Sequence, residues 1–285
     1  MDEVVEPATT KSGVPDANDV YALGRSPAES VRLVRQADEW ATDSKALLGR
    51  LALAPGQSAI DLGCGPRGIL DLLAERVSPD GRVIGLDANP VHTAMAAEFV
   101  APRALSSVEV ITADARHTGL PSSSFDVVHA SALLINLPDP SQVVSEMARL
   151  ARPGGWVASM EPDTELVLCY PPNPAFNRVC EIFPAVFARN GADPWMGRRV
   201  PELFRQAGLE DVGVEARMQV YPAGHRRRTV RCDLVRSMWP QIVELGLASH
   251  ADLEAWDAAA RSHLEDPNTV AICELLFLTW GRKPL

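Results

Sequence analysis

Apolar positions in the middle of the chain follow two different periods. Five short, largely apolar runs have the length of buried strands: 57–62, 82–87, 107–112, 125–130 and 156–161. Three segments between them repeat apolar residues with the spacing of a helix face: 68–77, 90–100 and 140–151. Strands that alternate with helices in this way predict βαβ units, and therefore an α/β fold with a mostly parallel sheet and helices on both faces.

The N-terminal flank of this alternating region has its own pattern. Residues 1–18 are polar and are predicted to be a disordered tail, whereas 19–53 have the apolar spacing of a helical arm or lid. Residues 26–29 (Ser-Pro-Ala-Glu) have the residue order of a capped helix start. We therefore divide the chain into the tail, the arm, a ligand-binding core at 54–161 and a C-terminal part at 162–285.

The C-terminal part combines a predicted cap with the remaining strands. Residues 162–195 are rich in proline and aromatic residues, and we interpret them as an irregular or helical cap with substrate-binding insertions. The rest is predicted to form a helix, a strand, a long helical stretch and a last strand: 199–207, 212–220, 229–264 and 270–280. These last two strands bring the predicted sheet to seven.

Composition excludes several classes of partner. The 285 residues carry a formal net charge of -10 without a basic stripe, which argues against a nucleic-acid partner; the three arginines at 226–228 are expected to lie in a solvated turn or strand edge. Five scattered cysteines without a C-x-x-C pair indicate a reducing compartment, with neither disulfides nor a zinc site. The chain shows no signal peptide and no run of ~20 apolar residues, so we expect a cytoplasmic protein that does not span a membrane.

The most specific motif is the glycine-rich stretch at 61–68, Asp-Leu-Gly-Cys-Gly-Pro-Arg-Gly. Gly63, Gly65 and Gly68 have the G-x-G-x-x-G spacing that turns a strand sharply into a helix and lets a ligand approach the backbone. Asp61 precedes them, and a carboxylate there would repel the pyrophosphate of a dinucleotide. S-adenosylmethionine (SAM) brings a cationic methionine end and no phosphate, so the motif favours SAM.

Two further acids follow the next two predicted strands. Asp87 ends the second strand, and Asp114 follows the third. Right-handed crossovers place the carboxyl ends of parallel strands on one edge of a sheet, which is where α/β proteins bind ligands. Asp87 alone could cap the helix that begins at Pro90, but the three acids together predict a SAM site.

The chain resembles the class I SAM-dependent methyltransferases of the ubiquinone and menaquinone type, over roughly residues 50–220. The resemblance rests on the stretches at 61–66, 125–130 (Phe-Asp-Val-Val-His-Ala) and 152–156 (Arg-Pro-Gly-Gly-Trp). It implies a Rossmann-like fold with SAM as the methyl donor and S-adenosylhomocysteine as the product. The cofactor residues that it implies are Asp61, Gly63, Cys64, Gly65, Asp87, Ala113, Asp114, Ala115, Ala130 and Ser131. Arg67 departs from the glycine that is frequent in the family, and we expect its side chain to point outward.

Within this set, the resemblance assigns a role to each part of SAM. The turn at 61–68 would hold the methionine end, with Ala130 and Ser131 near it. Asp87 would accept hydrogen bonds from both ribose hydroxyls, a task that suits a carboxylate. Asp114 would face the adenine amino group.

Candidate catalytic residues are fewer, because SAM carries its own leaving group and a base is needed only for a poorly acidic acceptor. His129 ends the fourth strand and is the best-placed histidine, although a packing role is open for it. Glu161 ends the fifth strand and could contact substrate or SAM, or cap the following turn. Tyr21, in the arm, could place its ring over the site and its hydroxyl on the SAM carboxylate, or simply pack. No H-E-x-x-H motif or carboxylate cluster predicts a metal.

The predicted cap suggests the acceptor. Its aromatic residues, Phe176, Phe183, Phe187 and Trp195, suit an apolar, ring-bearing substrate and could stabilise a cation formed by methylation. Core packing is the alternative for each of them.

The N-terminal helix, the late helical insertion and the aromatic cap together resemble actinobacterial natural-product methyltransferases, in particular teleocidin-pathway C-methyltransferases. That resemblance implies C-methylation of a prenyl-chain alkene of an indole alkaloid, followed by cation-driven ring closure. O-methylation of a phenol, quinone or polyketide, or a cyclase that uses SAM only structurally, are the alternatives. Exchange of the N-terminal helix between subunits would make the protein a homo-oligomer.

Overall fold

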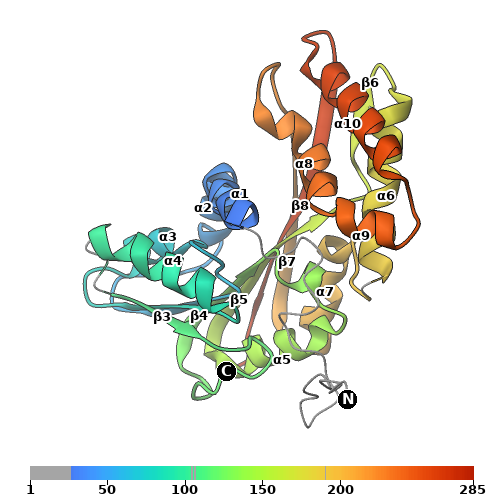
Figure 1. The fold of residues 1–285 in the computed structure, drawn as a ribbon. Helices are drawn as coiled ribbons and strands as arrows, with labels where there is room; N and C mark the ends of the chain where they lie inside the picture. The colour runs from blue at the N-terminus through green and yellow to red at the C-terminus, as the bar shows by residue number, and fades with distance from the viewer. Residues whose placement is uncertain (1–26, 104, 106, 190) are drawn as a thin grey trace, which may run out of the picture.

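A computed structural model describes residues 27–103, 105, 107–189 and 191–285, and it shows an α/β protein with a helical upper part (Figure 1). The predicted tail, Tyr21 and Ser26 lie outside the described residues. The sheet contains eight strands among the described residues: β1 (Ser58–Leu62), β2 (Arg82–Asp87), β3 (Val108–Thr112), β4 (Phe125–Ser131), β5 (Ala151–Asp163), β6 (Leu168–Tyr170), β7 (Glu210–Val220) and β8 (Val270–Arg282).

The order of the strands places β1 at the centre of the ligand-binding half. The sheet runs β3-β2-β1-β4-β5-β8-β6, and β7 pairs with β8 as well. β3, β2, β1, β4 and β5 are parallel, with Ile60 of β1 opposite Ile84 and Val128, whereas β8 is antiparallel to its neighbours. The predicted mostly parallel sheet is therefore confirmed, and its parallel strands end on one edge.

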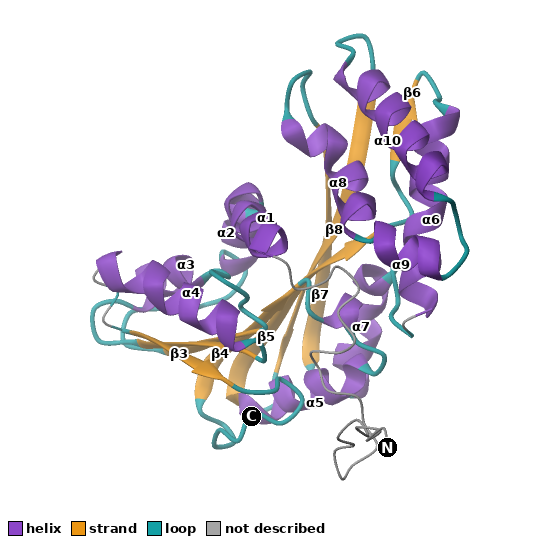
Figure 2. Ribbon diagram, in the orientation of Figure 1, coloured by secondary structure: helices purple, strands orange, loops and turns teal. Residues whose placement is uncertain are grey.

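Helices cover both faces of this sheet, as Figure 2 shows. Two buried clusters fill the two sides. One joins β1 and β2 to α2 (Ala41–Leu48), α3 (Leu70–Val77) and α4 (Pro90–Val100). The other joins the opposite face to α5 (Pro140–Leu150) and α7 (Met196–Gln206). Strand residues with neighbouring numbers, such as Ala59 and Ile60, fall into different clusters because side chains alternate across a strand.

The sheet departs from the predicted one in two places. β5 begins at Ala151, and the turn predicted at 152–155 lies inside the strand because the pairing with β4 shifts between Phe125 and Val127. Gly154, at a φ of 75°, absorbs part of this irregularity. β6 forms within the segment predicted to be irregular, and it pairs with the far end of β8. The sheet therefore has eight strands rather than seven.

The cap consists of helices packed beside the extended end of β8 (Figure 1). Its helices are α6 (Pro174–Arg189), α8 (Val230–Ser237), α9 (Trp239–Glu244) and α10 (His250–Glu265), and a 3-10 turn, η3 (Arg226–Thr229), directly precedes α8. The single helical stretch predicted at 229–264 is broken twice. Pro240 starts α9, and Ser249 and Asp252 form a capping box that starts α10.

The three arginines of η3 correct the expectation of a solvated turn. Arg227 and Arg228 are buried, and only Arg226 is exposed. Arg228 donates to the carbonyl oxygens of Leu264 (2.6 Å) and Thr269 (2.5 Å), which ties η3 to the end of α10.

The N-terminal arm forms two helices, α1 (Pro27–Glu39) and α2, that lie between the core and the cap (Figure 1). Glu39 binds buried Arg227 at 2.8 Å and exposed Arg226 at 2.5 Å, and Arg227 also pairs with Glu274 of β8. The arm is thus fastened to the cap by charge pairs, one of which is buried.

None of the described helices is long and apolar enough to cross a membrane.

Candidate functional site

The glycine turn after β1 has the conformation that its sequence predicts. Gly63, Gly65 and Gly68 have φ values of 68°, 58° and 56°, a region that residues with a β-carbon rarely adopt. A β-carbon on Gly63 would come within 2.8 Å of Leu133 Cδ1, whereas one on Gly65 would meet nothing within 4 Å. Gly65 therefore presents its bare backbone to open space, as a turn that receives a ligand requires.

Asp61 lies at the bottom of this turn and is buried. Its Oδ2 accepts the backbone N–H of Ile69 at 3.0 Å, so that the carboxylate holds the turn to the start of α3. Its Oδ1 is 2.7 Å from Nδ1 of His129, which stands opposite Asp61 on β4. A buried carboxylate needs such donors because it has lost its water. The predicted cofactor residue and the predicted catalytic histidine are therefore direct partners.

Asp87 stands at the end of β2 with both oxygens turned toward backbone donors. Oδ2 accepts from Gly65 N at 2.9 Å, and Oδ1 accepts from Asn89 N at 2.8 Å. His92, in the first turns of α4, brings Nδ1 to 3.6 Å from Oδ1. A carboxylate oxygen accepts more than one hydrogen bond, so Asp87 keeps capacity for the two hydroxyls of a ribose.

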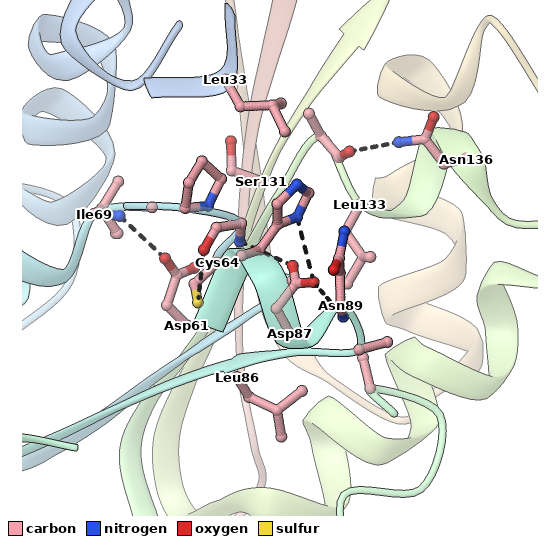
Figure 3. A pocket seen from close by; sticks show the side chains of 18 of the residues that line it. Leu33, Asp61, Cys64, Ile69, Leu86, Asp87, Asn89, Ser131, Leu133 and Asn136 are labelled. Carbon is pink, nitrogen blue, oxygen red and sulfur yellow. Dashed lines mark hydrogen bonds and ion pairs between the residues drawn. The ribbon is translucent and has the colours of Figure 1, made fainter. Parts of the chain in front are cut away.

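These residues surround one cavity, which Figure 3 shows from close by with Asp61, Asp87 and Ser131 labelled. Of the eleven predicted cofactor residues, Tyr21 lies outside the described residues and eight line the cavity: Asp61, Gly63, Cys64, Gly65, Asp87, Asp114, Ala115 and Ser131. Ala113 and Ala130 do not, although Ala113 N bonds Asp87 O at 3.1 Å and so places the chain at the end of β2. Ala130 is buried in the core.

Cys64 is a buried member of the turn. Its Sγ lies 3.5 Å from the carbonyl oxygen of Gly65. Burial, with Asp61 and Asp87 nearby, raises the pKa of the thiol well above its usual value. The side chain thus stays a neutral packing group under the turn.

Asp114 lines the cavity with a cation beside it. The Arg116 guanidinium binds it at 2.7 Å and the Arg116 backbone N–H at 2.8 Å. Burial works to raise the pKa of the Asp114 carboxyl, but these bonds outweigh it and lower the pKa below its usual value. Asp114 therefore meets a ligand as a carboxylate, able to accept from an adenine amino group.

The Arg67 side chain does not line the cavity, in keeping with the outward orientation expected for it, but it packs against other residues instead of reaching into solvent. Its guanidinium reaches Asp38 of α1 and Asp71 of α3, the latter at 3.1 Å, and lies over the ring of Phe99. The side chain is 15% exposed. At this position the family frequently has glycine. In this chain Arg67 instead links the N-terminal arm to α3, the helix that follows the glycine turn.

His129 and Glu161 are both fully buried, and neither lines the cavity. Glu161 accepts the backbone N–H groups of Leu133 and Leu134 at 3.0 Å each and that of Ile135 at 3.2 Å. It thus caps the turn after β4, and not the turn that follows Glu161 in the sequence, which was the expected alternative. Burial raises the pKa of its carboxyl to about 7, although the three backbone donors favour the charged form.

A second cavity adjoins the first, and the two share Leu33, Gln36, Trp40, Ala132 and Asn136. Phe183 and Phe187 of α6 line it, with ring centroids 4.7 Å apart. The other two predicted substrate residues lie elsewhere: Phe176 is buried in the core, and Trp195 is exposed just before α7.

Several lining residues escaped the sequence reasoning. Leu33, Gln36, Ala37 and Trp40 of the arm close the first cavity. The helical spacing of the arm indicated an apolar stripe but not what the stripe covers. His92 and Asn136 lie in ordinary loop and helix contexts, and no motif marks them.

The cavity suits SAM on its own geometry. Gly65 leaves room for the methionine end, Asp87 has free acceptor capacity for the ribose, and Asp114 and Ala115 stand where the adenine would lie. When bound, SAM supplies an electrophilic methyl group on a cationic sulfur. The chain's own residues then have to bind it, keep water out and align an acceptor. Among the described residues, no group of three or more His, Cys, Asp or Glu side chains could hold a metal ion.

Comparison with known proteins agrees with this assignment. Residues 60–159 match a family model described as a methyltransferase domain. The demethylmenaquinone methyltransferase of Geobacillus kaustophilus (strain HTA426) is 30% identical over 203 residues, which cover 65% of this chain and 83% of that protein. Nocamycin O-methyltransferase of Saccharothrix syringae is 40% identical over 120 residues, 42% of each chain. The chain spans less than half the length of the first curated relatives that it matches, 46% and 42%.

Solved structures share the fold. Phosphoethanolamine N-methyltransferase 2 of Haemonchus contortus, in complex with SAM, superposes with a TM-score of 0.58 at 20% identity, covering 96% of this chain and 61% of that one. Fold and site together define a Rossmann-like protein with a cavity that suits SAM. The chain belongs to the class I SAM-dependent methyltransferases.

Proposed function

We propose that the protein methylates a small, apolar, ring-bearing natural product that binds in the second cavity. The observation that carries this proposal is the junction of the two cavities at Trp40, Ala132 and Asn136. An acceptor in the second cavity would face the methionine end of SAM, which the glycine turn places in the first. Alignment of this kind is the main task of a methyltransferase, because the leaving group is already built into SAM.

The particular reaction that we propose is C-methylation of a prenyl-chain alkene of an indole alkaloid. The alkene π electrons would form a bond to the methyl carbon while the C–S electrons return to sulfur, which leaves S-adenosylhomocysteine and a carbocation. Attack of a second π bond on that cation would close a ring, and loss of a proton would end the reaction. Such a step needs no initiating base, in keeping with the burial of His129 and Glu161.

The aromatic wall of the second cavity supports the same reaction. Phe183 and Phe187 present ring faces that stabilise a positive charge nearby. The Arg231 guanidinium lies 4.1 Å from the Phe183 ring centroid, so a cation already occupies one side of that ring. We therefore expect the Phe187 ring to serve the developing carbocation.

O-methylation of a phenol, quinone or polyketide is the second candidate. The similarity to nocamycin O-methyltransferase and to demethylmenaquinone methyltransferases favours it. A hydroxyl acceptor of low acidity would require a base. His92, which lines the first cavity beside Asp87, is the lining histidine to test in that case.

Mass spectrometry of reactions with SAM tests these alternatives. The protein would be incubated with prenylated indoles, phenols and quinones in parallel. A product heavier by one methylene unit on a prenylated indole, with release of S-adenosylhomocysteine, supports C-methylation. Turnover restricted to phenols or quinones would replace it with O-methylation. Cyclised product without release of S-adenosylhomocysteine would mean that SAM is structural.

A further inference from the structure

We propose that the second cavity recognises a neutral acceptor by two specific polar groups, Asn136 and Thr164. The Asn136 carboxamide oxygen would accept a hydrogen bond from an N–H or O–H group of the acceptor. The Thr164 hydroxyl would bond a second polar group of the same molecule. The inference rests on the proposed function, since it takes the second cavity as the acceptor site, and it adds hydrogen-bonding groups to an acceptor otherwise described only as apolar.

The orientation of Asn136 is determined by its neighbour. Its Nδ2 donates to the carbonyl oxygen of Ala132 at 2.7 Å, as Figure 3 shows. Because that carbonyl can only accept, the amide nitrogen must face it and Oδ1 must point the other way. Oδ1 is buried and has no hydrogen-bond partner among the described residues. A buried acceptor without a partner destabilises the folded protein, so its retention calls for an explanation.

The backbone around this contact supports a functional explanation. Ala132 has a φ of 47°, which an alanine adopts only at a cost. Its N–H donates to the carbonyl oxygen of Met160 at 2.9 Å, and its carbonyl oxygen accepts from Asn136 Nδ2. Ala132 and Asn136 line both cavities. The unpartnered oxygen therefore belongs to a residue at the junction where the acceptor would meet the methyl group.

Thr164 provides the second group, within the second cavity alone. Its backbone N–H donates to the carbonyl oxygen of Pro194 at 3.0 Å, which holds the residue after β5. Its Oγ1 is buried and has no partner among the described residues, although a hydroxyl can both donate and accept. An acceptor that reaches from Asn136 to Thr164 would satisfy both atoms at once.

Paired charges around the second cavity favour a neutral acceptor. The Arg231 guanidinium, which also lines this cavity, lies against the Phe183 ring. The Asp163 carboxylate, fully buried beside Thr164, is held by Arg198, with one contact of 2.8 Å. Arg227 is paired with Glu39 and Glu274. Because these charges compensate one another, an ionised acceptor would gain no counter-charge from them and would lose its hydration. A secondary amide, a phenol or a quinol has the required donor without a charge.

Direct binding separates this recognition from the chemistry. The protein saturated with S-adenosylhomocysteine would be titrated calorimetrically with two probes, a prenylated indole carboxamide with a free amide N–H and the same molecule methylated on that nitrogen. One lost neutral hydrogen bond corresponds to about a 5- to 10-fold change in Kd. We expect the wild type to prefer the free amide by about that factor, and Asn136→Leu to lose the preference.

Thr164 supplies the matched pair of variants. Thr164→Val keeps the shape and removes the hydroxyl, whereas Thr164→Ser keeps the hydroxyl. We expect Thr164→Val to weaken binding of the free amide about 5-fold and Thr164→Ser to bind it within about twofold of the wild type. The Kd of S-adenosylhomocysteine should stay the same in both, because Thr164 does not line the first cavity.

The proposal would be overturned if the free amide did not bind, or if the wild type bound the two probes equally. It would also be overturned if Asn136→Leu kept the preference for the free amide, or if valine and serine at position 164 had identical effects. Failure of the proposed function looks different. In that case the free amide binds with the expected preferences, yet neither methylated product nor S-adenosylhomocysteine forms when SAM is supplied.

Discussion

Gly68 lies directly against the carboxylate of Asp61: a β-carbon at position 68 would overlap Asp61 Oδ2. The third glycine of the motif is therefore required by the first acid. Asp61 Oδ2 accepts the backbone N–H of Ile69 and occupies the space that a side chain at position 68 would need. This hydrogen bond, which closes the turn, therefore requires glycine at position 68. The motif residues are a single packed unit in which the acid and the glycine each depend on the other.

Three Gly→Ala variants separate the roles of the glycines. Gly68→Ala should lower the free energy of unfolding by roughly 3 kcal/mol or more, because overlap with Asp61 adds to backbone strain. Gly65→Ala should lower it by only about 1–2 kcal/mol, since its β-carbon meets nothing, but should weaken SAM binding strongly. Gly56→Ala, at a φ of 82° with open space around it, is the control for strain alone. Chemical denaturation and calorimetry measure both quantities, and equal SAM affinity in Gly65→Ala and Gly56→Ala would contradict this assignment.

Asp87→Asn should weaken SAM binding about 10- to 100-fold, because hydrogen bonds to a charged group contribute about 1.5–3 kcal/mol. Asp126→Asn is the matched control. Asp126 also accepts a backbone N–H, from Ser58 at 2.8 Å, but it opens β4 and does not line the cavity. Its variant should lose some stability and keep the wild-type Kd for SAM. If the two variants bound SAM equally, Asp87 would not be the ribose ligand.

His129 should act as a positioning residue for Asp61 rather than as a base. His129→Asn retains an N–H donor toward Asp61, whereas His129→Leu leaves a buried carboxylate short of one partner. We expect the leucine variant to lose stability and SAM affinity, and the asparagine variant to recover most of both. Profiles of kcat against pH decide the matter: loss of the acidic limb, in which kcat rises with pH, in both variants, with SAM affinity intact, would make His129 a base.

Glu161 should make stability depend on pH between about 4.5 and 7. Burial raises the pKa of this carboxyl from 4.5 to about 7, so in that range the folded protein binds more protons than the unfolded chain. Its contribution to the free energy of unfolding is complete below pH 4.5 and is lost as the pH rises through 7.

Denaturation of wild type and Glu161→Gln at pH 4.5–8 measures this dependence. The glutamine variant should be less stable at every pH, because its amide nitrogen cannot accept from a backbone N–H, but should lack the slope. Glu146→Gln is the control, since bonds from Arg149 and Thr118 overcome burial and hold the Glu146 pKa at about 2, outside the tested range. A slope of unchanged size in Glu161→Gln would refute the assignment to this residue.

Arg67→Gly introduces the residue that is frequent in the family at this position, and it should make the N-terminal arm less tightly packed. The change removes the contacts of Arg67 with Asp38 and Asp71, and with them the link between α1 and α3. We expect faster hydrogen exchange in α1 and a few-fold weaker SAM binding, because α1 closes the first cavity through Leu33 and Gln36. Arg82→Gly, which removes an exposed pair with Glu109 on the sheet, should change neither.

The sequence alone was sufficient for the parts of the protein built from local rules. A short apolar run and a helical spacing of apolar residues placed β2 and α4 at their observed bounds, and the acid–glycine spacing identified the cofactor turn. These features are local because strand pairing, right-handed crossovers and glycine conformations leave few other arrangements. Three acids separated along the chain could therefore be assigned to one edge of the sheet.

The tertiary structure determined which side chains, distant in the sequence, contact one another. It paired Arg67 with Asp38, made Glu161 a cap for the turn after β4, and buried Arg227 between Glu39 and Glu274. It also divided the four cap aromatics, since only Phe183 and Phe187 reach the second cavity. Residue type reports that a side chain is apolar or charged, but packing between segments distant in sequence determines whether it faces a ligand or another residue.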